Sequence, residues 1–218
     1  GTSTGGSELF AAAEGNNVHI LDYHSGELVH VFAGEAKGTH RPGMSTESYG
    51  HGGVVTALVH DCTHIFSGST DETIRKWNTS THDQEIIFRG HEGSITAIAV
   101  DQRWMASGSS DTTMRLWDKH TGQQIRTIYG HNKSVLSIDL GHTWMLSGSA
   151  DEEVRVWTIK EKSKHTTNVD CNNRLIGHET SVTCVKYSKL EIISADILGR
   201  IFIWWMKTGE VIKRIQAH

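Results

Sequence analysis

The sequence predicts an all-β fold built from repeated four-stranded units, and a period shared by three residue types supports this. A histidine preceded by glycine recurs after 40, 40 and 47 residues, at His51, His91, His131 and His178. A period of 40 also separates three aspartates in Ser-Gly-Ser-x-Asp and three tryptophans, which are Asp71, Asp111, Asp151, Trp77, Trp117 and Trp157. One proline and 22 glycines indicate tight turns between short strands. A common period of this length indicates a series of similar structural units.

The unit at residues 90–129 shows how four strands fill one period. Strand a is predicted over 95–100, where β-branched and small residues alternate, and strand b over 104–109. A tight turn leads to strand c over 114–117. A Thr-Gly turn then leads to strand d over 124–129. Four short antiparallel strands therefore occupy each unit.

The order of the motifs indicates which known family the chain resembles. Gly-His, then about 20 residues to the aspartate of Ser-Gly-Ser-x-Asp, then Trp-Asp, is similar to the WD40 repeat over residues 9–218. The second residue of the Trp-Asp pair is aspartate only at Asp118. The resemblance implies that each unit is one blade of a β-propeller and packs beside its neighbours around an axis.

The repeat predicts five blades. They cover residues 9–33, 50–89, 90–129, 130–176 and 177–216. Residues 1–8 are predicted to be a disordered leader, and residues 34–49 and 160–174 to be mobile surface loops. Blade one has no strand a. Because the family usually closes a ring of about seven blades, the sequence predicts an open arc of a larger ring, with self-association expected at its free strand edges.

In the WD40 family, the repeated histidine, serine, aspartate and tryptophan form one hydrogen-bonded network within each blade. The resemblance implies that the aspartate accepts from the imidazole, whose other nitrogen meets the strand b hydroxyl, and that this hydroxyl accepts from the indole. The matching residues are His51, Ser67, Asp71, Trp77, His91, Ser107, Asp111, Trp117, His131, Ser147, Asp151, Trp157, His178, Ser194 and Trp204. Blades two, three and four hold complete sets.

The first and last blades depart from this pattern. In blade one, Ala11, Gly15 and Leu21 stand where serine, aspartate and tryptophan are expected, so no network is predicted there. In blade five, alignment on the tryptophan puts Leu198 in the place of the aspartate. Asp196 lies two residues earlier, so it completes the network only if the turn between strands b and c is reshaped.

Serine, histidine and aspartate also build catalytic triads, but such a site is built once per protein. Here the set recurs in three blades in one register, as structural cross-bracing requires, so the chain is predicted not to be an enzyme. No metal is predicted, because the network histidines belong to separate blades and the other histidines form no HxH or HxxxH cluster with a carboxylate. No cofactor is expected.

Composition bears on nucleic-acid binding, membrane insertion and cellular compartment. Lysine and arginine total 21, aspartate and glutamate total 25, and no basic block stands out, so nucleic acid is not an expected partner. No apolar run approaches about 18 residues, so the chain is not expected to span a membrane. Three cysteines without CxxC spacing favour a reducing compartment, and the chain is predicted to be cytoplasmic or nuclear.

The resemblance implies a non-enzymatic platform for protein or peptide partners. The family presents such partners with a face made from the loops between strands d and a and the turns between strands b and c. The candidate contact residues on that face are Thr70, Glu92, Ser94, Ser110, Asn132, Ser134, Glu179 and Ser181. Of these, Glu92 and Glu179 favour a basic partner segment.

Two alternative functions are a substrate receptor of a ubiquitin ligase and a propeller hydrolase or lectin. Short units of this kind also occur in F-box proteins, where the propeller is the substrate receptor of a ubiquitin ligase. Receptors for phosphorylated peptides need arginine on strand a, whereas the equivalent positions are Thr56, Thr96, Leu136 and Thr183. A propeller hydrolase or lectin would need a converging carboxylate pair or an aromatic sugar platform, and the sequence offers neither.

Overall fold

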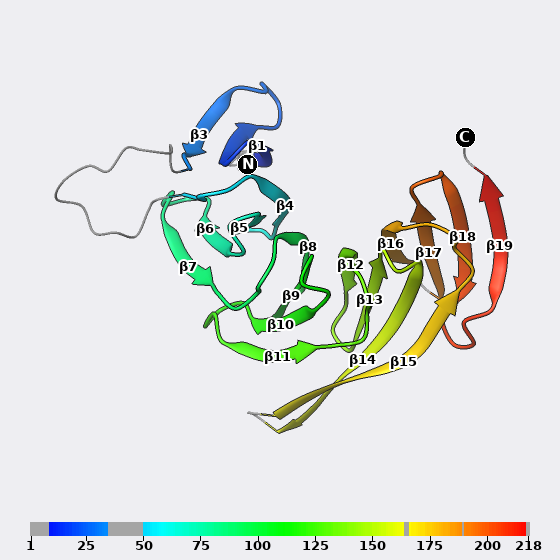
Figure 1. Cartoon of the computed structure of the whole chain (residues 1–218). Coiled ribbons are helices and arrows are strands. Elements are labelled where there is room, and N and C mark those ends of the chain that lie inside the picture. The colour runs from blue at the N-terminus through cyan, green and yellow to red at the C-terminus, as the bar shows by residue number, and fades with distance from the viewer. Residues whose placement is uncertain (1–8, 35–49, 164–165, 189, 217–218) are drawn as a thin grey trace, which may run out of the picture.

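The computed structural model describes residues 9–34, 50–163, 166–188 and 190–216. Over these residues the chain forms nineteen β-strands and no helix, and therefore no helix that could cross a membrane. Figure 1 shows small sheets that follow one another along an arc, with the first and last sheets apart. The predicted leader, and the predicted loop at 34–49 beyond its first residue, lie outside the described residues. The fold is all-β and consistent with a partial, open β-propeller.

Five antiparallel sheets contain the described strands. The first sheet holds β1 (Leu9–Glu14), β2 (Asn17–Asp22) and β3 (Leu28–Phe32). The second holds β4 (Val55–His60), β5 (His64–Ser69), β6 (Ile74–Asn78) and β7 (Gln84–Phe88). The third holds β8 (Ile95–Val100), β9 (Trp104–Ser109), β10 (Met114–Asp118) and β11 (Gln124–Ile128). The fourth holds β12 (Val135–Leu140), β13 (Trp144–Ser149), β14 (Glu153–Ser163) and β15 (Thr166–Ile176). The fifth holds β16 (Val182–Ser188), β17 (Glu191–Asp196), β18 (Arg200–Trp205) and β19 (Val211–Gln216).

Within each sheet, the strands lie side by side in the order of the chain. Sheets two to five therefore have the predicted order a, b, c, d, and the first sheet lacks strand a. We refer to the sheets as blades one to five.

The hydrophobic core lies between neighbouring blades. Leu146 and Val156 of blade four pack in one buried cluster with Val185, Ile192 and Trp204 of blade five. Apolar side chains are needed on both faces of strands b and c because a neighbouring blade covers each face. This explains why β9 is buried along its whole length. A rigid stack of blades results, and their loops and turns are held at its two ends.

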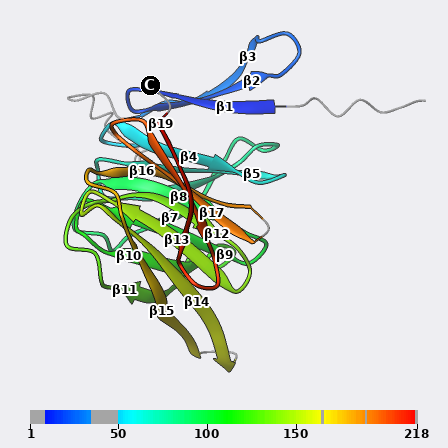
Figure 2. The same cartoon turned by 90° about the vertical axis from the view of Figure 1, so that its right-hand side faces the viewer.

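The prediction of a mobile loop at residues 160–174 is wrong. Residues 160–163 and 166–174 belong to β14 and β15, which pair as a long hairpin in which Ile159 lies opposite Val169 and Lys160 opposite Asn168. Figure 2 shows this hairpin reaching beyond the other strands. Ile159 and Val169 pack against the cluster that contains Trp104 of blade three. Packing against a neighbouring blade therefore stabilises strands whose polar composition resembled that of a loop.

The alignment of blade one also needs a correction. Leu21 pairs with Phe10, just as Trp77 pairs with Ile65 in blade two. The serine position lies two residues further along strand b, so Ala12 occupies it and not Ala11. The prediction that blade one has no network is unaffected, because alanine provides no hydroxyl.

Candidate functional site

Each histidine of the repeat lies at the centre of a short chain of hydrogen bonds, which we call a brace. In blade two, Trp77 Nε1 donates to Ser67 Oγ at 2.8 Å, and this hydroxyl lies 2.8 Å from His51 Nε2. His51 Nδ1 lies 2.9 Å from Asp71 Oδ2. Because an indole can only donate and a carboxylate can only accept, the serine hydroxyl donates to Nε2 and the neutral ring donates from Nδ1.

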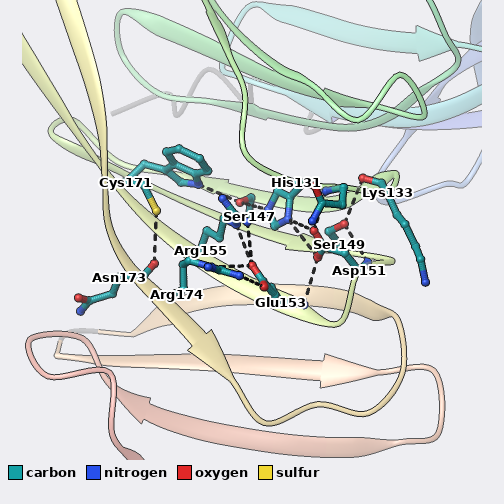
Figure 3. A network of polar contacts seen from close by, with 12 residues as sticks. His131, Lys133, Ser147, Ser149, Asp151, Glu153, Arg155, Cys171, Asn173 and Arg174 are labelled. Carbon is teal, nitrogen blue, oxygen red and sulfur yellow. Dashed lines mark hydrogen bonds and ion pairs between the residues drawn. The ribbon is translucent and has the colours of Figure 1, made fainter.

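Blades three and four repeat this geometry. The distances from the histidine to the aspartate and serine are 2.7 and 2.8 Å for His91, and 2.9 and 2.7 Å for His131. The indoles of Trp117 and Trp157 each donate to the serine of their blade at 2.9 Å. Figure 3 shows His131 between Ser147 and Asp151 in blade four. The structure thus brings together the predicted residues of all three complete sets.

The aspartate of each brace fixes the turn between strands b and c. Asp71 Oδ1 accepts from the backbone N–H of Thr73 at 2.9 Å and from its hydroxyl at 2.6 Å. Asp71 Oδ2 accepts from the backbone N–H of Gly52 in the d–a loop at 2.9 Å. One carboxylate therefore ties the loop to the turn. Between Asp71 and Thr73 the backbone turns through Glu72, whose φ of 70° is left-handed.

Blade five completes its brace with Asp196, which the sequence left open. His178 Nδ1 lies 2.9 Å from Asp196 Oδ2, and both side chains are fully buried. Asp196 pairs with Val182 as Ser69 pairs with Val55, so it occupies the position of the second serine of Ser-Gly-Ser. The informative signal in the sequence was therefore an aspartate at this serine position, two residues before the expected one.

A second change accompanies this shift. Arg200 stands four residues before the tryptophan, where blade two has Thr73, and its Nε donates to Asp196 Oδ2 at 2.8 Å. Arg200 Nη1 also lies 2.6 Å from Glu179 Oε2. Arginine thus replaces threonine as the donor to the carboxylate and, in addition, reaches the d–a loop.

The protonation states follow from these contacts. Burial alone would raise the pKa of Asp111, but hydrogen bonds from Thr113 and His91 outweigh it and lower the pKa to about 2. The pKa of Asp196 is also about 2, because the bonds from His178 and Arg200 outweigh its burial. Burial lowers the pKa of His91 and of His178. Each of these two braces therefore holds an ionised carboxylate against a neutral imidazole at neutral pH.

The braces are built for support. Ser67, Ser107 and Ser147 are fully buried, and each hydroxyl already contacts an indole and an imidazole. A buried hydroxyl held in this way does not reach a substrate. Among the described residues, His131, Asp151 and Glu153 come close enough together to share an ion. However, Glu153 binds Arg155 and Arg174, and Asp151 binds the imidazole.

The predicted contact residues lie beside one another at one end of the blades. In four blades, a backbone N–H of the b–c turn donates to a carbonyl of the d–a loop. The four bonds are Thr70 N to Val54 O at 2.9 Å, Ser110 N to Ser94 O at 3.0 Å, Ala150 N to Ser134 O at 2.9 Å and Ile197 N to Ser181 O at 3.1 Å. Each b–c turn is therefore held against the d–a loop of its own blade. We call the surface made by these loops and turns the interaction face.

The side chains on the interaction face differ in how free they are. Glu92, Ser110 and Asn132 are exposed. Thr70 is also exposed, but its hydroxyl accepts from the backbone N–H of Val54 at 2.9 Å. The three serines of the d–a loops are half-buried, and these are Ser94, Ser134 and Ser181. Glu179 is exposed but paired with an arginine, so its negative charge is partly neutralised, which the sequence did not indicate.

Comparison with known proteins settles the family. The model of the WD domain, G-beta repeat, matches residues 43–78, 83–118 and 122–158, which is half of the chain. The chain belongs to the WD40 repeat family. A comparison with curated protein sequences finds no match.

Two solved structures are similar to this WD40 chain. One is the computationally designed Ika8 protein, with a TM-score of 0.73 and 27% identity over 96% of this chain and 58% of that one. The other is U3-55K, with a TM-score of 0.77 and 19% identity over 95% of this chain and 61% of that one. The chain therefore spans about three fifths of the length of these two proteins.

Proposed function

We propose that this chain is a non-enzymatic scaffold that binds peptide or domain partners on the interaction face. WD40 repeats and the similar structures support a protein-interaction scaffold in general. The observation that carries the finer proposal is that four braces tie the d–a loops to the b–c turns. Loops that are already ordered lose little conformational entropy when a partner binds, so a rigid face favours affinity.

The exposed side chains of the interaction face favour a polar contact in which Glu92 is the free carboxylate. Glu92, Ser110 and Asn132 project from blades three and four without a side-chain partner among the described residues. A backbone amide or a basic side chain of the partner would complement these groups. The neutralised Glu179 weakens the expectation of a strongly basic partner that rested on two carboxylates.

The alternative function, a substrate receptor of a ubiquitin ligase, would use a similar surface. The strand a positions that carry arginine in readers of phosphorylated peptides hold threonine in blades two and three. Thr56 Oγ1 donates to Ile95 O, and Thr96 Oγ1 donates to Val135 O, in each case across to the next blade. These threonines stabilise the junctions, so the described positions favour an unphosphorylated partner.

We also place the chain in the cytoplasm or nucleus. All three cysteines, Cys62, Cys171 and Cys184, are exposed and unpaired. Exposed free thiols suit a reducing compartment.

A site-specific cross-linking experiment tests the interaction face. A photo-reactive residue at Ser110 or Asn132 is expected to capture a defined partner in cells, whereas one at the exposed Asp83, in a c–d turn at the other end, is not. Glu92→Lys is expected to reduce capture from Ser110, because it reverses the charge of the nearest free carboxylate. Capture from Asp83 but from neither Ser110 nor Asn132 would move the binding surface elsewhere. Unchanged capture from Ser110 in Glu92→Lys would show that Glu92 does not contact the partner.

A further inference from the structure

At the end opposite the interaction face, one residue occupies the same backbone position in four blades, two residues after the tryptophan of strand c. In each case the backbone N–H of this residue donates to a carbonyl of the a–b turn. The four bonds are Thr79 N to Thr63 O at 3.0 Å, Lys119 N to Arg103 O at 3.2 Å, Ile159 N to Thr143 O at 2.8 Å and Met206 N to Leu190 O at 3.1 Å. The junctions between blades can therefore be compared residue by residue.

Two of these junctions are chemically matched. Between blades two and three, Lys119 Nζ lies 2.9 Å from Asp61 Oδ2, and the two side chains are 8% and 22% exposed. Between blades four and five, Met206 packs in the cluster of Trp144, and Gly141 stands where the a–b turns of blades two and three have aspartate. A carboxylate thus meets an ammonium group at one junction, and an apolar side chain meets an apolar surface at the other.

The junction between blades three and four is mismatched. Asp101, 40 residues after Asp61, keeps the carboxylate, but Ile159 takes the place of the lysine. Asp101 Oδ1 accepts from the backbone N–H groups of Arg103 and Trp104 at 2.8 and 2.6 Å. Asp101 Oδ2 is buried and has no hydrogen-bond partner among the described residues, and the same holds for Trp104 Nε1. A buried carboxylate oxygen without a partner is costly, so the site favours an added donor.

The charged groups around Asp101 do not supply such a donor. Arg103 is engaged elsewhere, because its Nη1 lies 2.7 Å from Glu161 Oε1 and its guanidinium lies over the Trp104 ring. His142 Nδ1 lies 3.9 Å from Asp101 Oδ2, beyond hydrogen-bond distance. The His142 side chain is 74% exposed, so packing does not hold it there.

We propose that Asp101 receives a lysine ammonium group of a binding partner at the junction of blades three and four. The ammonium group would take the position that Lys119 Nζ takes at the preceding junction. A compact ammonium fits because the internal precedent is a lysine, and because it can donate to Asp101 Oδ2 without a planar fork. His142 turns aside to admit it.

The β14–β15 hairpin defines how the partner would approach. The hairpin passes this junction at Ile159, and the ion pair of Glu161 with Arg103 ties it to blade three. Figure 2 shows the hairpin extending outward at this end of the blades. A lysine-bearing segment would therefore lie alongside the hairpin. This site is separate from the interaction face and does not depend on it.

Binding of n-butylammonium, which reproduces the end of a lysine side chain, tests the site directly. The probe is titrated at constant ionic strength against the whole chain, and the indole and backbone amide signals of Trp104 are followed by NMR. We expect a saturable shift of these signals, and none with n-butanol, which lacks the charge. A peptide with a single central lysine is expected to bind in the same way, and its acetyl-lysine form is not.

Two variants separate this site from other binding. Asp101→Asn keeps the oxygen that accepts from Arg103 and Trp104 but removes the charge, so the probe should bind at least about tenfold more weakly. Ile159→Lys copies the Lys119 arrangement and should fill the site from within, so that the probe no longer shifts Trp104. Equal binding in the wild type and both variants would overturn the proposal. Absence of binding to the wild type, together with a loss of stability in His142→Ala, would show that His142 is the partner of Asp101.

Discussion

Replacing Asp111 with alanine tests whether the braces stabilise the blades. The carboxylate accepts four hydrogen bonds. They come from His91 Nδ1 at 2.7 Å, Glu92 N at 3.0 Å, Thr113 N at 2.8 Å and Thr113 Oγ1 at 2.7 Å. Alanine removes both acceptor oxygens, and with them all four hydrogen bonds, while it leaves the backbone of the turn intact.

The expected loss depends on which donors water can reach afterwards. The bond to the Glu92 amide is exposed, so water can replace the carboxylate there. The His91 side chain is 1% exposed, and the Thr113 amide is partly buried, so these two donors lose their partner without full replacement. At about 1–3 kcal/mol for each of these two unpaired groups, the free energy of unfolding should fall by about 2–6 kcal/mol. A domain of ordinary stability has about 5–15 kcal/mol, so this is a large fraction.

Equilibrium unfolding in urea measures this loss. Tryptophan fluorescence reports on the brace, because Trp117 Nε1 donates to the serine that contacts His91. Circular dichroism reports on the sheets, and coincident transitions would justify a two-state treatment. Asp83→Ala is the matched control, since Asp83 is an exposed aspartate whose carboxylate makes no hydrogen bond with a described residue.

The comparison of the two variants decides the outcome. Asp83→Ala should change the free energy of unfolding by less than about 0.5 kcal/mol. If Asp111→Ala also loses no more than this, the hydrogen bonds of the brace do not stabilise the fold. The rigidity of the interaction face would then need another explanation.

Three further predictions concern pH, the b–c turn and the blade junctions. Stability should fall in two steps as the pH is lowered. The first step lies below about 6.5, because burial lowers the pKa of His91 and the unfolded chain binds the proton first; the second lies between about 4 and 2, where protonation of Asp111 removes its contribution. Urea midpoints measured across this pH range would show both steps, and a flat profile would contradict the prediction. Thr112→Gly should raise the free energy of unfolding by about 0.5–1 kcal/mol, seen as a higher urea midpoint. The reason is that Thr112 has a left-handed φ of 72°, as Gly199 has with 73° at the equivalent position of blade five. An unchanged midpoint would mean that the turn is unstrained. Lys119→Met should lower the free energy of unfolding by about 1–3 kcal/mol, because it leaves the largely buried Asp61 carboxylate of blade two unpaired. Thermal or urea unfolding measures this loss, and a stabilised variant would contradict the prediction.

The sequence predicted the features that repeat. In blade three, strands a and b were predicted over residues 95–100 and 104–109, where β8 and β9 lie. The residues of three braces were assigned from the resemblance to the WD40 repeat, at positions that recur with the period. This succeeds because each brace lies within one blade, so the same spacing returns the same contacts each time. A period carries no information about contacts that a single blade makes with its neighbour.

The hairpin at β14 and β15 illustrates that limit. Its strands contain many polar residues, and local composition predicted a loop. Ile159 is buried and Val169 is partly buried against the cluster that contains Trp104 of blade three, a contact that local composition does not reveal. The sequence also did not predict that Asp101 meets Ile159 at the same junction, because this contact is recognised only when the three described junctions are compared.

Blade five keeps the hydrogen bond between aspartate and histidine although its aspartate stands at a different position of the repeat. In blade two, Ser69 Oγ accepts from the backbone N–H of Asp71 at 3.1 Å, and Asp71 then reaches the histidine. In blade five, Asp196 takes the place of that serine, and its longer side chain reaches His178 directly while also accepting from the backbone N–H of Leu198 at 3.0 Å. One residue thereby performs both tasks. The turn is free to carry an apolar residue at the usual aspartate position, and Arg200 takes the place of the threonine that donates to the carboxylate elsewhere. The two substitutions depend on each other, because the Asp196 side chain is 0% exposed and needs a charged donor more than the aspartates of the other braces, which are 7–16% exposed.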